Sequence, residues 1–419
     1  MSLMVIISIG AVILFLIGTP IMVVIGLWCI GASIESGLSL ANMGSMMFEG
    51  LNSFGLLAMP LFVLTGDLIM NAGIAKKLTD FAYACLSFIR GSQAMATIGA
   101  CGFFAAISGS NAATAATIGS IMHPDLVKEG YDDKFAAATI AAGGVVGIII
   151  PPSVLFIVYG FMTNISVADM FIGGIIPGIL MVTAMTATAF FIARKHGWGR
   201  VEPLNIRNII RAGCNAYLGF GAIGLIMYGI YTGKFSCTES AAVCVGYTVL
   251  AGLFITRELT LKTLPDLLFK SGKIVGMTCP LVAMSIVMQQ CLTSLGIEDI
   301  LASLLEGLGV TGFLFLSCLL IFICGMFLES TPCITILAPI LAPIATSLGI
   351  HPVHFAVITM VGLAIGFITP PFGLNLFVAS AVTGVYYVHI IRAVAVYVLV
   401  LLASWIVIIV APWMSLALL

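Results

Sequence analysis

The chain has 419 residues, of which 61% are hydrophobic and 8% are charged, and its mean hydropathy is +1.22. This composition excludes a soluble globular domain, because several charge-poor windows exceed the roughly 20 residues that span a bilayer. The formal net charge is −1, and no run of basic residues is dense enough to bind nucleic acid. We therefore expect a polytopic protein in a lipid bilayer, with about a dozen full or partial crossings and no nucleic-acid partner.

Residues 1–50 are expected to form an opening hydrophobic pair, and its first segment to be a retained helix, since no basic region precedes it as in a signal peptide. Eleven cysteines are scattered through apolar segments without a Cys-x-x-Cys pair, so we interpret them as small hydrophobic side chains. Residues 194–211 form a polar connector with five Lys and Arg residues, which favours a cytoplasmic location.

Two proline pairs mark an internal repeat. Pro151-Pro152 and Pro370-Pro371 interrupt apolar stretches and lie 219 positions apart (370 − 151 = 219). The same offset relates Pro124 to Pro343. Prolines that recur at one constant offset in a hydrophobic chain predict two repeats, each with a broken helix. Such a pair of broken helices is typical of the binding site of a transporter.

Short arms predict a re-entrant hairpin in each repeat. About 15 residues separate Ser92 from the polar tip at 108–111, and about 12 more reach His123, so each arm is too short to cross the bilayer. The mirror hairpin is expected from Gly312–Leu328 and Pro332–Ser347. The loop at 123–134 contains two lysines, whereas its counterpart at 342–354 has no Lys or Arg. Corresponding loops therefore face opposite sides, as inverted repeats require.

The hairpin tips and the helix breaks carry the residue types that a transport site needs. Non-helical backbone persists at membrane depth only when it is buried in protein or lines a cavity. The proline pairs remove amide donors and free carbonyls, which suit Na⁺, while half-helix N-termini suit an anion. We assign substrate binding to Ser108, Ser110, Asn111, Pro152, Thr331 and Asn375. We assign cation binding to Ser108, Gly109, Asn111, Gly144, Gly147, Glu329, Ser330, Gly366, Thr369, Pro370 and Gly373.

Structural roles compete with these assignments. Gly143-x-x-x-Gly147 is also a helix-packing motif, and small residues in membrane helices commonly serve close packing. Glu329, an intramembrane carboxylate, has two compatible interpretations: a functional group, or a cap for the half-helix that begins at Ser330. Asp67 lies at a segment end, where we expect a solvated or capping carboxylate. The sequence lacks His-Glu-x-x-His, Gly-x-Ser-x-Gly and Walker A motifs, so we expect no enzyme activity.

The chain resembles the large membrane subunit of the tripartite ATP-independent periplasmic (TRAP) transporters over nearly its whole length. The resemblance is carried by the segments 60–67 (PLFVLTGD), 108–117 (SGSNAATAAT), 130–132 (GYD), 143–153 (GGVVGIIIPPS), 238–242 (TESAA) and 366–375 (GFITPPFGLN). Family members usually have Thr-Pro where this chain has Ser236-Cys237, which leaves the role of that turn open. They often carry Asp at the position of Glu329 and Glu at that of Asp67, so the carboxylate is kept.

The resemblance implies a Na⁺-coupled importer of organic acids, such as sialic acid or a C4-dicarboxylate, in the bacterial inner membrane, using two or more Na⁺ ions. Its expected partners are a periplasmic substrate-binding protein and a small four-helix membrane subunit on a separate chain. It also implies an elevator mechanism. The transport domain would comprise residues 94–168 and 307–384, and the scaffold residues 1–93 and 169–306, the latter including the connector; 385–419 form a C-terminal helix.

Three other functions remain open at this stage. The runner-up is a stand-alone Na⁺/dicarboxylate symporter that needs no binding protein. An ion channel is compatible with re-entrant hairpins alone, but two complete broken-helix repeats argue against it. An intramembrane enzyme is the weakest alternative, because no nucleophile is paired with a base in the sequence.

Overall fold

The computed structural model describes residues 3–296, 300 and 309–419, and within these residues every regular element is a helix. Among the described residues, seven helices are long and apolar enough to cross a membrane, or eight if the bent pair α11 and α12 counts as one span. Six further helices are apolar but shorter. The prediction of an all-α polytopic membrane protein is therefore confirmed.

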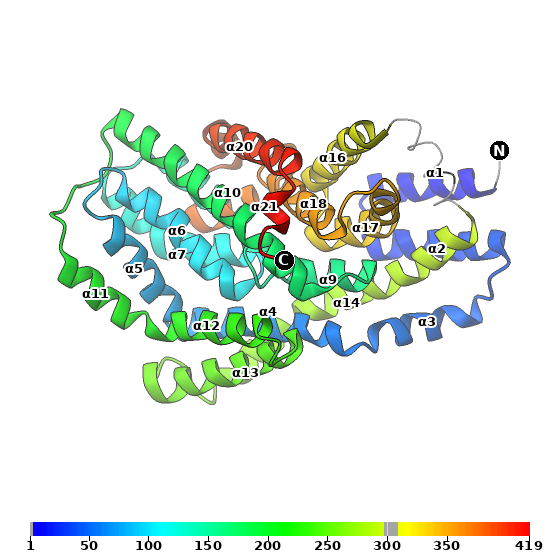
Figure 1. Ribbon diagram of the computed structural model, residues 1–419, viewed down its shortest axis with the longest axis horizontal. Helices are drawn as coiled ribbons and strands as arrows, with labels where there is room; N and C mark the ends of the chain where they lie inside the picture. Colours follow the sequence, from blue (N-terminus) through cyan, green and yellow to red (C-terminus); the bar gives the residue numbers. More distant parts are fainter. Residues whose placement is uncertain (1–2, 297–299, 301–308) are drawn as a thin grey trace.

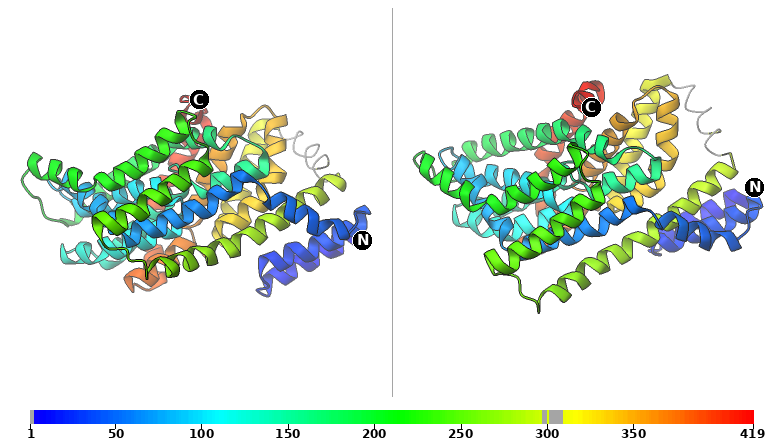
Figure 2. Two further views of the ribbon diagram at one scale, coloured as in Figure 1. Left: turned by 90° about the horizontal axis from the view of Figure 1, so that it is seen from below. Right: turned by 60° about the horizontal axis from the view of Figure 1, so that its bottom comes forward.

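One group of helices is built from the N-terminal and middle parts of the chain. Its long helix α14 packs along α2 and α3 at one end and against α4 in the middle, and α4 also packs on α13 (Figures 1 and 2). The helices of this group are α1 (Leu3–Leu16), α2 (Ile21–Ser36), α3 (Ala41–Leu51), η1 (Phe54–Leu57), α4 (Ala58–Asn71), α5 (Ile74–Leu86), α11 (Ile206–Asn215), α12 (Tyr217–Tyr231), α13 (Cys237–Leu250), η3 (Ala251–Thr256) and α14 (Leu264–Ser294).

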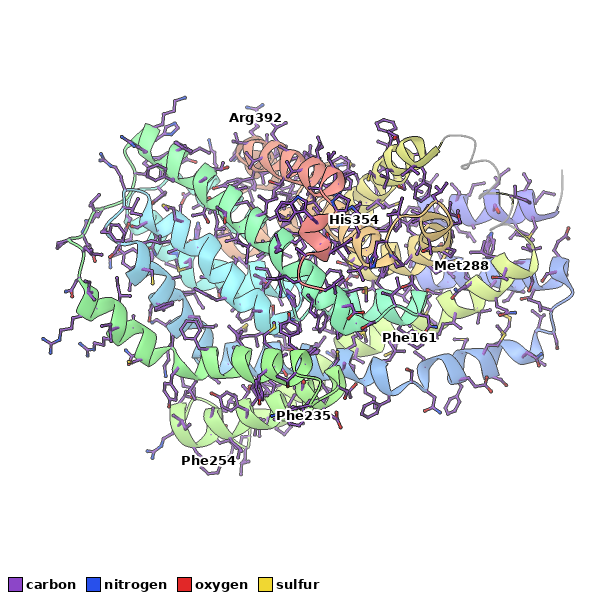
Figure 3. The ribbon with its side chains drawn as sticks, in the orientation of Figure 1. Phe161, Phe235, Phe254, Met288, His354 and Arg392 are labelled. Carbon is purple, nitrogen blue, oxygen red and sulfur yellow. The ribbon has the colours of Figure 1, made fainter. Side chains whose placement is uncertain are left out.

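The second group contains the two sequence repeats. Its long helix α10 packs against α6, α18 and α20, and the terminal helix α21 is joined to α18 by a contact of 3.3 Å between His354 Nδ1 and Ser415 Oγ (Figure 3). The helices are α6 (Ser92–Ser108), α7 (Asn111–Lys128), α8 (Asp133–Gly144), η2 (Val145–Ile148), α9 (Val154–Thr163), α10 (Val167–His196), α16 (Gly309–Phe327), α17 (Ser330–Ser347), α18 (Pro352–Gly366), α19 (Leu374–Thr383), α20 (Tyr387–Val410) and α21 (Trp413–Leu416).

Both predicted hairpins and both broken helices are present. The pairs α6–α7 and α16–α17 turn within two residues, and α8–α9 and α18–α19 are interrupted at the proline pairs. Local chemistry explains the first turn. Gly109 ends α6 with a φ of +60°, a conformation that favours glycine, and the Ser110 hydroxyl then caps α7.

The repeats interlock rather than lying side by side. The second hairpin helix α17 packs against α9 of the first repeat, and α7 of the first hairpin packs against α19 of the second. This exchange brings the two hairpin tips together near the middle of the molecule.

The proposed boundary between residues 306 and 307 lies outside the described residues. The division into a mobile and a fixed part stays a prediction, and α10, which we assigned to the scaffold, packs chiefly on helices of the repeats.

Candidate transport site

Both hairpin tips open onto one small cavity of about 70 Å³. The tips and the start of α9 form one side, and the helices α4 and α14 of the first group form the other. The lining residues are Met59, Val63, Gly109, Ser110, Asn111, Ile148, Val154, Leu155, Ile274, Val275, Thr278, Glu329, Ser330 and Thr331.

Three helix N-termini converge on this cavity. α7 begins at Asn111, α9 at Val154 and α17 at Ser330, and all three residues line the cavity wall. The first amide groups of a helix lack carbonyl partners within the helix and carry a partial positive charge. An anionic group in the cavity would therefore meet three favourable dipole ends.

Hydrogen bonds within the first tip hold its backbone in place. The Ser110 hydroxyl accepts a hydrogen bond from the Ala113 amide at 3.4 Å. The Thr114 hydroxyl donates to the Ser110 carbonyl at 2.7 Å and also lies 3.0 Å from the hydroxyl of Ser108. Ser108 and Asn111 are buried, at 2% and 4% exposure. The first tip is thus a compact polar turn that is satisfied largely by its own side chains.

The first helix break is fitted against this tip. The Val154 amide donates to the Gly109 carbonyl at 3.3 Å, and the Ser153 hydroxyl donates to the Ile148 carbonyl at 2.8 Å. At Gly147 an added Cβ would lie 2.8 Å from the Asn111 Cα and still closer to the Ser110 carbonyl. Only glycine permits this approach, because the neighbouring atoms belong to the backbone.

Two buried asparagines near this break have unpartnered polar atoms. The side-chain Nδ2 of Asn375 donates to the Ala141 carbonyl at 3.3 Å and so joins α19 to α8. Its Oδ1 atom and the Nδ2 atom of Asn111 are buried without a hydrogen-bond partner in the described part of the chain. Both asparagines border Gly144, where an added Cβ would meet Asn375 Nδ2 at 2.9 Å and the Asn111 carbonyl at 3.1 Å. The buried Asn375 Oδ1 is an oxygen acceptor without a donor, and such an atom has the chemistry of a Na⁺ ligand.

The second tip is less enclosed. Glu329 occupies the N-cap position of α17, but its side chain makes no capping hydrogen bond. The capping interpretation is therefore not realised, and the exposed Glu329 side chain lines the cavity instead. Ser330 and Thr331 follow it with 5% and 7% exposure.

The second break is tied to its own hairpin and to α20. The Gly373 amide donates to the Met326 carbonyl at 3.2 Å. The Tyr387 hydroxyl lies 2.7 and 2.8 Å from the carbonyls of Pro371 and Phe372, so it contacts backbone oxygens within the break itself. At Gly366 an added Cβ would lie 2.6 Å from the carbonyl carbon of Gly325, again a contact that only glycine allows.

Comparison with known proteins identifies the family. The model of the tripartite ATP-independent periplasmic transporter, DctM component, matches residues 1–414. The chain belongs to this family. It is 38% identical to the C4-dicarboxylate TRAP transporter large permease protein DctM of Pseudomonas aeruginosa, over 91% of this chain and 90% of that protein. The resemblance seen in the sequence is thus confirmed.

Other TRAP permeases with different named substrates are also similar. The sialic acid TRAP transporter large permease protein SiaM of Vibrio cholerae is 32% identical over 83% of this chain and 82% of its own length. The isethionate TRAP transporter permease protein DctMQ of Oleidesulfovibrio alaskensis is 37% identical over 88% of this chain, which covers 59% of that longer protein. These relatives are transporter permeases and not enzymes.

A solved structure shares the fold. The crystal structure of the Alcanivorax borkumensis YdaH transporter, described as having an unusual topology, aligns with a TM-score of 0.61. The alignment covers 89% of this chain and 88% of that chain at 14% identity, so the likeness concerns the fold alone.

In this DctM-family chain, the predicted site residues divide into two sets. Gly109, Ser110, Asn111, Glu329, Ser330 and Thr331 line the shared cavity. The others lie behind it, either packed against the first tip or at the second break; they are Ser108, Gly144, Gly147, Pro152, Gly366, Thr369, Pro370, Gly373 and Asn375. Sequence reasoning missed Thr114, Ser153 and Tyr387. Thr114 and Ser153 lie within the family motifs, so the motifs could have pointed to them as site residues. Nothing in the sequence connects Tyr387 to the second break.

Proposed function

We propose that this DctM-family protein is a Na⁺-coupled secondary importer of a small organic acid. One observation carries the proposal: three positive helix ends and the polar tips of both repeats meet at a single cavity. The helix ends favour a carboxylate or sulfonate group. The named substrates of the relatives, C4-dicarboxylate, isethionate and sialic acid, share an acidic group of this kind.

Two cation sites, one for each repeat, are part of the proposal. In the first repeat the unpartnered Asn375 Oδ1 and the carbonyls around Gly144 supply oxygen ligands. In the second repeat Gly366, Thr369 and Pro370 present the backbone of the break. Across the described residues, no three His, Cys, Asp or Glu side chains gather as a metal group. Hard oxygen ligands of this sort favour Na⁺ over a transition metal.

The elevator movement, the partners and the location complete the proposal. The predicted transport domain, residues 94–168 and 307–384, contains both tips and both breaks, so these segments are suited to move together across the first helix group. A small membrane subunit and a periplasmic substrate-binding protein would complete the tripartite transporter that the family description names. The assembly would lie in the bacterial inner membrane.

The decisive experiment is uptake by proteoliposomes that contain this chain, its small subunit and its binding protein. We expect accumulation of an organic acid from a panel of succinate, isethionate and N-acetylneuraminate under an inward Na⁺ gradient. Uptake that is unchanged when choline or K⁺ replaces Na⁺ at constant pH contradicts the proposal. In addition, Na⁺ should raise the melting temperature, since a ligand present at 100 times its Kd stabilises the native state by about 2.7 kcal/mol.

A further inference from the structure

An ion pair lies beside the cavity on its scaffold side. Lys270 Nζ in α14 is 2.7 Å from Asp67 Oδ1 in α4. Val63 and Ile274 line the cavity, and Asp67 and Lys270 are each four residues away from them. Because residues four apart share one face of a helix, the pair lies one turn along the same two faces that form the cavity wall.

The two members of the pair are held differently. Asp67 is only 12% exposed, and its second oxygen accepts a hydrogen bond from the Ser271 hydroxyl at 2.7 Å. It is therefore an internal counter-ion rather than the solvated or capping carboxylate that the sequence suggested. The Lys270 side chain is 53% exposed. An ammonium group has three N–H donors, and the bond to Asp67 uses one, so Lys270 retains donors for a second anion.

The Lys270 ammonium supplies a positively charged side chain, which the cavity wall lacks. Of the described residues that line the cavity, none is Lys or Arg, so positive potential there comes from the helix ends alone. Helix dipoles act within about one turn, and an anion that moves along α4 and α14 leaves their range. Lys270 lies one helical turn from the cavity-lining Ile274, so its ammonium provides a positive group beyond the helix ends.

We propose that Lys270 binds the acidic group of the transported anion as it passes between the cavity and the adjoining surface of α14, and that Asp67 serves only as the counter-ion of the ammonium when no anion is bound. This inference rests on the proposed transport of an organic acid. The competing explanation is a structural tether between α4 and α14. The two differ in one respect: a tether needs both partners equally, whereas an anion needs only the lysine.

The test compares three variants, and a control described below, in proteoliposomes with the small subunit and the binding protein. Uptake is measured with the acid from the panel of succinate, isethionate and N-acetylneuraminate that the wild type accumulates. Lys270→Cys should raise the half-saturating anion concentration about tenfold, the value of a charged hydrogen bond, and Lys270→Arg should restore it. Asp67→Asn should lower the melting temperature as much as Lys270→Cys but leave the half-saturating concentration within about twofold.

Chemical rescue and a matched lysine sharpen the test. In a Cys214→Ser background, which removes an exposed thiol, aminoethyl methanethiosulfonate restores an ammonium at position 270 and should rescue Lys270→Cys. The anionic sulfonatoethyl reagent should not. Lys273→Cys is the control, since Lys273 lies on the same helix but stacks over the Phe269 ring at 4.7 Å.

Equal rescue by both reagents, or an equal rise in half-saturation for Asp67→Asn and Lys270→Cys, overturns the inference. The half-saturating Na⁺ concentration should stay unchanged in Lys270→Cys. Na⁺-independent uptake by the wild type would instead contradict the proposed function, so the two failures are distinguishable.

Discussion

The two hairpin tips occupy equivalent places in the two repeats but are stabilised differently. In the first repeat Ser110 caps α7, and the Thr114 hydroxyl fixes the Ser110 carbonyl. In the second repeat Glu329 stands at the same kind of helix start, yet its carboxylate makes no capping bond and remains exposed. The breaks behind the tips are more alike, because in each a backbone amide donates to a carbonyl at the end of the first hairpin helix, as Val154 does to Gly109 and Gly373 to Met326.

This comparison separates the contacts that the fold requires from the side chains that serve ion or substrate binding. The glycine contacts and the backbone bonds between break and hairpin recur in both repeats, so they belong to the shared architecture. The capping hydroxyl and the free carboxylate do not recur. We therefore expect the first tip to be ordered without ligand, and the second tip to gain most of its order when Na⁺ or substrate is bound.

The largest effect is expected at the shared glycine contacts. Gly147→Val and Gly366→Val would each place a side chain against backbone atoms of the hairpin, and overpacking of this kind typically costs about 1–3 kcal/mol. Both variants should lose Na⁺-driven uptake and melt at lower temperature. Gly276→Val in α14, where an added Cβ meets nothing within 4 Å, is the matched control. Wild-type melting and uptake for either variant would show that the close approach is not needed.

The cap of the first tip should affect stability more than the carboxylate of the second. Ser110→Ala removes the N-cap of α7 and should cost about 1 kcal/mol in unfolding free energy, the usual value of such a cap. Ser120→Ala, a change on the same helix away from the tip, is the control. Glu329→Gln should leave the unfolding free energy nearly unchanged, since no capping bond is lost, but should raise the half-saturating Na⁺ concentration. If Glu329→Gln destabilises the protein as much as Ser110→Ala, the contrast between the tips is wrong.

Asn375 tests whether the two repeats share a cation site. Its side chain comes from the second repeat, but it bonds the Ala141 carbonyl of the first. Asn375→Ala should therefore weaken Na⁺ binding at the first tip and raise the half-saturating Na⁺ concentration severalfold. Asn42→Ala, at the start of α3, should not. Unaltered Na⁺ dependence of uptake in Asn375→Ala would remove this residue from the cation site.

Much of this architecture was predictable from the sequence because it depends on local chemistry. Glycine and proline positions and short apolar arms located both tips and both breaks to within a few residues. The cross-packing of α17 on α9, the bond from Asn375 to Ala141 and the pair of Lys270 with Asp67 were not predictable. Each joins residues that are about 150 or more positions apart, and no single segment carries a pattern that specifies its partner.

The smallest effect is expected at the second break, where Tyr387 has no counterpart in the first. Its hydroxyl lies near the Pro371 and Phe372 carbonyls, and its ring stacks on Phe377 with centroids 4.5 Å apart. Tyr387→Phe keeps the stacking and removes one donor, so it should cost about 1 kcal/mol in unfolding free energy. It also leaves both carbonyls free, which should lower the half-saturating Na⁺ concentration if those oxygens belong to the second cation site. Tyr386→Phe, on a neighbouring side chain that is 78% exposed, controls for the loss of a hydroxyl. Unchanged Na⁺ half-saturation in Tyr387→Phe would place the second cation site away from these two carbonyls, at Gly366 and Thr369.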